Sequence, residues 1–195
     1  MFTSVELADP PRRHLPGDLA MWFFILAELS VFAILILVFA VTQVLKPQLF
    51  AAGRQLLDTS TGLAMTLSLL TAGLFAALAQ ERVRHSRPRQ AALLLLAALL
   101  VACGYLLLKL GEYRHLLELG LGIEHNTFFT LYWLLSGFHF LHVVLGMLIL
   151  GWLAEGCRRR RYDADRRSGF ESGVLYWHMV DLIWVLLFPL VYVLG

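Results

Sequence analysis

Five ionisable side chains interrupt long apolar stretches of the sequence, and their types and spacing could do chemistry: Glu28, His139, His142, His178 and Asp181. His139 and His142 are three residues apart, as are His178 and Asp181, so each pair would share one helix face. Ionisable groups are costly inside a membrane span and usually face protein or water there. These five residues are therefore the first candidates for a site.

Four interpretations fit these residue types. Three imidazoles with a carboxylate suit Zn or Fe, and two histidines on neighbouring helices could ligate a haem. Carboxyl and imidazole groups could also relay protons. The alternative is a hydrogen-bond network that locks three helices together. We expect one contact network of Glu28, His142, His178 and Asp181, with His139 at its edge, and neither a haem nor a stoichiometric transition metal.

A second polar group follows the third apolar run and comprises Lys109, Glu112, Tyr113 and Arg114. Lys109 and Glu112 are three residues apart, which is the spacing of neighbours on a helix surface. We expect an ion pair at the outer membrane interface. A contact with a partner protein is the alternative.

The elements that must position these side chains are five apolar runs, with helices expected at about 19–45, 59–80, 90–110, 126–154 and 173–194. A span needs about 20 largely apolar residues to cross a core of about 30 Å, and its backbone must be hydrogen-bonded internally. The predicted fold is all-α, a polytopic membrane protein whose five-helix domain covers 19–195. A cytoplasmic arm at 1–18 precedes it, with Asp18 as the expected N-cap of the first helix.

The composition agrees with this class. Of the 195 residues, 59% are hydrophobic and 15% are charged, whereas soluble domains have roughly 45–50% and about 25%. That balance disfavours a soluble enzyme and a nucleic-acid-binding protein.

The distribution of the basic residues predicts the orientation. Of the Lys and Arg residues, 12 fall on the side of the N-terminus and 4 on the other side. Positive residues stay cytoplasmic, so we expect the N-terminus inside and the C-terminus in the periplasm, in a bacterial cytoplasmic membrane. The five ionisable residues of the spans would then all lie roughly 8–14 Å from the cytoplasmic edge.

Four segments carry a resemblance: MWFFILAELSVF at 21–32, KLGEY at 109–113, GFHFLHVVLGM at 137–147 and YWHMVDLIWVLLFPLVYVL at 176–194. Their order and spacing resemble subunit III of haem-copper oxidases over about 17–195, with this chain similar to the last five of seven helices. The resemblance implies a subunit without haem or copper that supports a haem-bearing catalytic subunit in stability, assembly or proton delivery. The residues that match the family's polar positions are Glu28, Glu112, His139, His142, His178 and Asp181.

Finer details point to a branch. Phe140, Met179, the stretch at 126–147 and the ending around Pro189 are most similar to the nitric-oxide-reductase-associated, NorE-like members. This similarity implies an accessory subunit of nitric oxide reductase in denitrifying metabolism. The alternative within the family is subunit III of a cytochrome c or quinol oxidase. A hypothesis of another class is an independent membrane protein that conducts protons or a small molecule. The expected partners are the catalytic subunit and membrane lipids.

Overall fold

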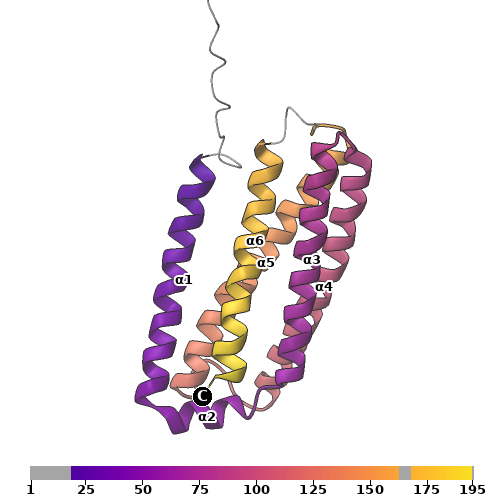
Figure 1. The fold of residues 1–195 in the computed structure, drawn as a ribbon. Coiled ribbons are helices and arrows are strands. Elements are labelled where there is room, and N and C mark those ends of the chain that lie inside the picture. The colour runs from indigo at the N-terminus through magenta and orange to yellow at the C-terminus, as the bar shows by residue number, and fades with distance from the viewer. Residues whose placement is uncertain (1–18, 163–167, 195) are drawn as a thin grey trace, which may run out of the picture.

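The computed structural model describes residues 19–162 and 168–194, which form a bundle of long helices (Figure 1). Its elements are α1 (Leu19–Leu45), α2 (Pro47–Arg54), α3 (Thr59–Arg84), α4 (Pro88–Glu118), α5 (Thr127–Arg158), α6 (Ser168–Phe188) and the π-helical turn η1 (Pro189–Val193). Five helices in this part of the chain are long and apolar enough to cross a membrane, the fifth being α6 continued by η1. The predicted fold class is confirmed. The arm at 1–18, including Asp18, lies outside the described residues.

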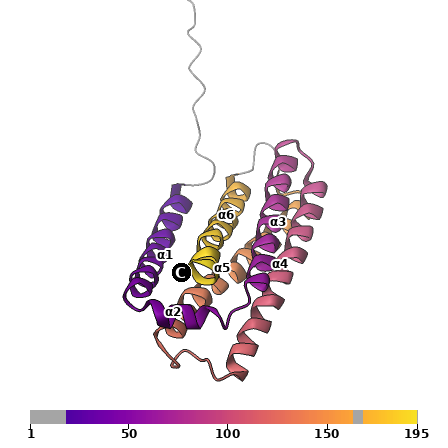
Figure 2. The same cartoon turned by 60° about the horizontal axis from the view of Figure 1, so that its bottom comes forward.

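The helices pack in a simple order. α3 and α4 form an antiparallel hairpin, α5 packs against α4, and α6 packs against both α5 and α3. α1 lies at the edge beside α6 and is the least buried of the five spans (Figure 1). The short α2, which was not expected from the sequence, lies across one end of the bundle between α1 and α3 (Figure 2).

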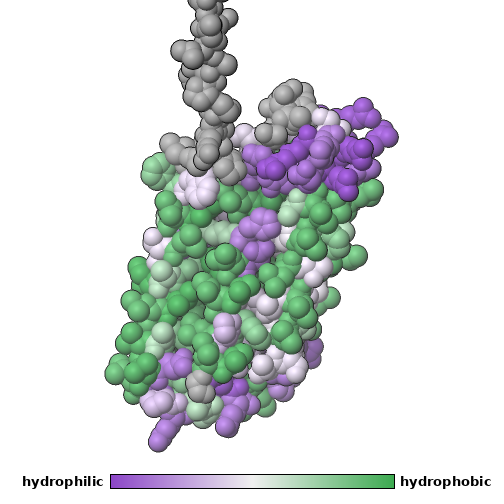
Figure 3. All heavy atoms as spheres, viewed as in Figure 1, coloured by the Kyte–Doolittle hydropathy of each residue, from purple (hydrophilic) through white to green (hydrophobic). Residues whose placement is uncertain are grey.

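The surface has the layout of a membrane protein. Figure 3 shows a broad apolar band between two polar ends. Large apolar side chains are exposed along this band, among them Leu37, Leu100, Leu107, Leu141 and Leu148. So many exposed leucine side chains would be unfavourable in water, whereas contact with lipid acyl chains is favourable for them.

The helix ends are set by local caps. The Asp58 carboxylate accepts hydrogen bonds from the N–H groups of Ser60 and Thr61, both at 3.1 Å, at the start of α3. The hydrogen bond from the Thr61 hydroxyl lowers the pKa of Asp58 and keeps this cap charged. Asn126 accepts from the N–H of Phe129 in the same way at the start of α5. Such caps satisfy N–H groups that a helix end leaves free.

Several helices continue beyond the apolar runs. α4 reaches Glu118 rather than about 110, and α6 begins at Ser168 rather than about 173. Polar residues at the membrane surface remain helical because they can pair with one another, as Arg114 and Glu118 do at 2.8 Å. The hydropathy of the sequence therefore predicts where a helix enters the lipid, whereas the capping residues determine where the helix itself ends.

Small residues let the helices approach one another closely. Ala72, Ala76 and Ala79 of α3 are fully buried, as are Ala91 and Ala98 of α4. Residues of this size allow close backbone packing in membranes, where van der Waals contact replaces the hydrophobic effect between helices. In α5, Gly146 provides the same close approach to Trp177 of α6, because a Cβ atom there would lie 2.9 Å from the indole ring.

We predict that Gly146→Ala destabilises the protein by about 1–3 kcal/mol, the usual range for overpacking. Trp177 is fully buried, so neighbouring side chains enclose its ring. Gly151→Ala in the same helix is the control, since the nearest atom to its new Cβ is 3.9 Å away. There the better helix propensity of alanine should leave stability unchanged or slightly higher. The melting temperatures of both variants can be measured by heating samples in detergent and quantifying the remaining folded protein by size-exclusion chromatography. Equal melting temperatures for the two variants would contradict the packing argument.

Candidate functional site

The first polar contact joins α1 to α5. Nε2 of His142 lies 3.0 Å from Oε2 of Glu28, and Nδ1 of His142 lies 2.8 Å from the carbonyl oxygen of Phe138. A carbonyl only accepts, so Nδ1 carries a proton. The contact with Glu28 then needs a second proton, either on Nε2 or on the carboxyl group. The pair therefore holds one exchangeable proton between two helices.

The second contact lies within α6. Nδ1 of His178 is 3.2 Å from Oδ2 of Asp181. Gly73 of α3 faces this pair, and a Cβ atom at that position would collide with the Asp181 carboxylate. Most of Asp181 is buried, but the His178 side chain is 39% exposed.

The structure thus arranges the expected network as two separate pairs. In the part of the chain that the structure describes, no hydrogen bond or ion pair links Glu28 and His142 to His178 and Asp181. The rotation of α6 is the reason. Tyr176 directs its ring and hydroxyl toward α1 and α5, where the hydroxyl donates to the His142 carbonyl at 3.4 Å. The opposite side of α6 faces α3.

His139 lies apart from both pairs. Its ring is fully buried, stacks on Trp184 with 5.1 Å between centroids, and meets Tyr105 edge-on. Neither ring nitrogen has a hydrogen-bond partner among the described residues. His139 therefore serves here as an aromatic packing residue between α4, α5 and α6.

The most extensive polar cluster surrounds Lys109, which is fully buried. Its ammonium group donates to Oε1 of Glu112 at 2.9 Å, to the Tyr132 hydroxyl at 3.1 Å and to the Tyr192 hydroxyl at 3.0 Å. Three donors thus meet three acceptors, which leaves the ammonium group saturated. The tyrosine hydroxyls donate in turn to the Glu112 carboxylate.

The expected ion pair between Lys109 and Glu112 forms, with 2.9 Å between Nζ and Oε1, but it is enclosed by the protein instead of lying at the surface. The side chains of Lys109 and Glu112 are 0% and 8% exposed. The physical reason is the aromatic enclosure, because the ammonium group also lies within 4.9–5.6 Å of the ring centroids of four residues: Tyr113, Tyr132, Trp184 and Tyr192. Arg114, expected in the same group, points away and pairs with Glu118 at the surface.

Tyr132, Trp184 and Tyr192 belong to this cluster, although they were not linked to Lys109 from the sequence. Pro189 ends α6, and the following turn η1 brings Tyr192 to Lys109. The sequence did offer one indication: a lysine inside a membrane span needs several hydrogen-bond acceptors, and tyrosine hydroxyls can supply them.

The chemistry open to these groups is hydrogen bonding and proton holding. No set of three His, Cys, Asp or Glu side chains converges as a metal site within residues 19–162 and 168–194. The histidines that could have ligated a haem together point in different directions, with His139 against Trp184 and His178 toward α3.

Comparison with known proteins assigns the chain. The profile of the family described as cytochrome c oxidase subunit III matches residues 17–195. The chain belongs to this family. Its described spans and their polar pairs are thus those of a subunit III family protein.

Three relatives show the range of similarity. The cytochrome c oxidase subunit 3 of Thermostichus vulcanus is 40% identical over 85 residues, which are 43% of this chain and 42% of that protein. The quinol oxidase subunit 3 of Bacillus spizizenii is 26% identical over 91% of this chain and 86% of its own length. The heme-copper oxidase subunit I+III of Aeropyrum pernix is 30% identical over 89% of this chain and 22% of its length. All three are named as oxidase subunits, so they support the cytochrome c or quinol oxidase alternative better than the nitric oxide reductase branch.

We predict that Lys109→Met destabilises the protein by about 3–5 kcal/mol, because the buried Glu112 carboxylate loses its counter-charge. The double variant with Glu112→Leu should recover part of the folded yield, since a buried ion pair can be replaced by apolar groups at little cost. Unfolding in detergent measures both variants.

The matched control is Arg114→Met, which breaks an ion pair whose side chains are 82% and 60% exposed. Such exposed pairs contribute less than about 1 kcal/mol. If Lys109→Met proved as harmless as Arg114→Met, the central role of the Lys109 cluster would be refuted.

Proposed function

We propose that this chain is a non-catalytic accessory subunit of a haem-copper terminal oxidase and binds its haem-bearing catalytic subunit in the membrane. Family membership supports this proposal. The Aeropyrum pernix relative, named as subunit I+III, supports it further, because its name joins both kinds of subunit in one protein. The role would be to stabilise the catalytic subunit, assist its assembly or support its proton-linked activity, for which the Glu28–His142 pair is the candidate group.

The observation that carries the proposal is the partial exposure of His178 within a membrane span. His178 lies ten residues, or roughly 15 Å, into α6. Figure 3 shows a polar patch over α6 that interrupts the apolar band. Ionisable groups inside a membrane cost about 2.5–3.5 kcal/mol even on the insertion scale. A partner helix with polar side chains would cover this pair better than acyl chains would. We therefore place the partner on the face formed by α3 and α6.

The partner enzyme could be a nitric oxide reductase or a terminal oxidase. The resemblance of 126–147, Phe140 and Met179 to the nitric-oxide-reductase-associated branch favours that enzyme. The relatives named above are cytochrome c and quinol oxidase subunits, and for this reason we favour a terminal oxidase. Purification of the tagged chain from its own membranes separates the two, because the co-purified enzyme would consume either oxygen or nitric oxide.

We predict that the wild-type chain elutes from detergent together with haem absorbance. A double variant with His178→Leu and Asp181→Leu should fold, because it removes both members of the pair, but it should lose the haem-bearing partner. The measurement is the ratio of haem absorbance to tagged chain in one size-exclusion peak.

Two comparisons sharpen this test. Ser30→Ala removes an exposed polar group of α1 that hydrogen-bonds to its own helix, and it should keep the partner. If the double variant kept the partner at the wild-type ratio, the α3–α6 face would be excluded. If the wild-type chain itself eluted without haem, the proposed function would fail.

The orientation is also part of the proposal. The concentration of arginines at the end formed by the α3–α4 turn and the end of α5 supports a cytoplasmic location for that end. A periplasm-specific reporter fused to the C-terminus should therefore be active. Activity of a cytoplasm-specific reporter at the same position would reverse the orientation.

A further inference from the structure

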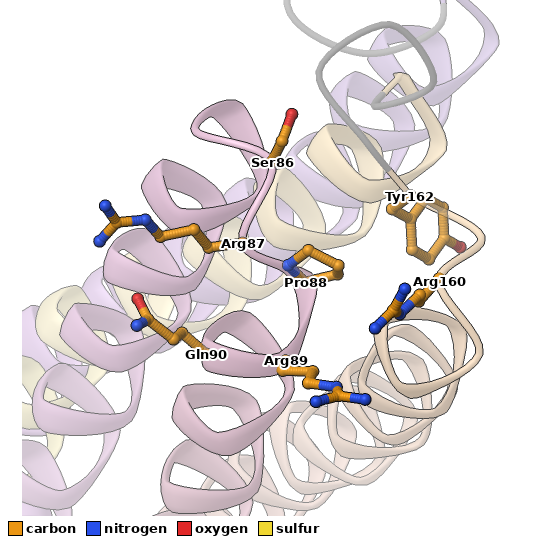
Figure 4. A pocket seen from close by; sticks show the side chains of 7 residues that line it. All are labelled: Ser86, Arg87, Pro88, Arg89, Gln90, Arg160 and Tyr162. Atoms are coloured by element: carbon orange, nitrogen blue, oxygen red, sulfur yellow. The ribbon is translucent and has the colours of Figure 1, made fainter.

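A pocket of about 560 Å³ lies at the arginine-rich end of the bundle, opposite the Lys109 cluster. It opens between the α3–α4 turn and the residues that follow α5 (Figure 4). Pro88 and Tyr162 form two of its walls. Arg89, from the first turn of α4, and Arg160, just beyond α5, extend toward one another across the gap, while Arg87 points away (Figure 4).

Among the described residues, these two arginines are not ion-paired, unlike several others at this end of the bundle. Arg84 pairs with Glu81 and Glu171, and Arg158 and Arg159 both pair with Glu155. Within the described ranges, Arg89 and Arg160 have no carboxylate partner. Two positive groups from separate elements thus converge on one space, an arrangement that an anion between them would stabilise.

The backbone adds to this preference for an anion. α4 starts at Pro88 and has no side-chain cap at its N-terminus, so the positive end of the helix dipole is directed at the pocket. Arg160, just beyond the C-cap of α5, has a φ of 54°, a left-handed conformation that glycine would adopt more easily. The N–H groups of Arg160 and Arg161 bond back to the carbonyls of Cys157 and Gly156, which holds this turn in place.

A stripe of exposed leucines leads away from the pocket along α4. Leu93, Leu96 and Leu100 are exposed and follow Arg89 at the spacing of one helix face. An amphiphile whose head lay between Arg89 and Arg160 would therefore find an apolar surface for its chains directly below. Arginine forks suit phosphate groups, which they can bind through two parallel hydrogen bonds.

We propose that this pocket binds a phosphate group, with the headgroup of an anionic phospholipid as the source that the leucine stripe favours. The Arg89 and Arg160 guanidinium groups would hold the phosphate oxygens from two sides, near the N-terminus of α4. This inference is independent of the proposed accessory function, since it rests on the pocket alone.

The experiment is native mass spectrometry of the full chain in detergent, titrated with phosphatidylglycerol or phosphatidylcholine. The wild type should bind phosphatidylglycerol more tightly than phosphatidylcholine. Arg89→Gln and Arg160→Gln should each weaken binding about fivefold, and together about twenty-five-fold. Arg158→Gln is the matched control, because its guanidinium group at the same end is already paired, and it should bind like the wild type.

Competition with inorganic phosphate distinguishes the two sources. If inorganic phosphate fails to displace the lipid even when it is present in large excess, the site is one for a phospholipid. If phosphate binds the wild type alone and displaces the lipid fully, the site takes free phosphate and the lipid assignment is overturned. Equal lipid binding by the wild type and the double arginine variant, with unchanged melting temperatures, would refute the site altogether.

Discussion

The positive charge of Lys109 is the constraint on which the packing of the bundle depends, because a fully buried ammonium group is tolerable only with a counter-charge and an acceptor for each donor. Glu112 supplies the charge from the same helix, Tyr132 reaches in from α5, and Tyr192 arrives on η1. Three elements are therefore held in one register by one cation. Trp184 extends the coupling to α3 through its hydrogen bond to Thr66 at 3.0 Å. The π-helical turn at Pro189 has a role in this arrangement, since it brings Tyr192 to the charge.

The five spans could be predicted from the sequence because a run of about twenty apolar residues has the length and composition of a membrane-spanning helix. Depth along the helices also placed Glu28 level with His142, and the two lie in contact at 3.0 Å. Depth contains no information about helix rotation, however. The rotation of α6 turns His178 and Asp181 toward Gly73 and away from Glu28. The burial of Lys109 could not be predicted from the sequence either, since it depends on Tyr132 and Tyr192, which lie 23 and 83 residues away in the chain.

The ionisable groups of the spans differ in whether the chain itself satisfies them. Lys109 has all its acceptors within the bundle, and Glu28 and His142 satisfy each other between α1 and α5. Such groups couple helices and need no other molecule. His178 also has a partner in Asp181, yet more than a third of its side chain faces outward from the spanning region. Such an outward-facing group in a spanning region is therefore a candidate contact for another molecule.

The level of an outward-facing group decides which molecule suits it. A headgroup phosphate stays at the membrane surface, where Arg89 and Arg160 lie at the end of the helices, whereas His178 and Asp181 are expected roughly 8–14 Å below the edge of the hydrocarbon core. Another polypeptide can bring polar atoms to the level of His178 without drawing water into the hydrocarbon layer. Conversely, the arginines at the surface need no protein partner, because water can hydrate them and lipid phosphates can supply negative charge there. The same physical requirement, compensation of charge near a membrane, thus underlies both proposals, a protein contact on the α3–α6 face and a phosphate contact at the arginine-rich end.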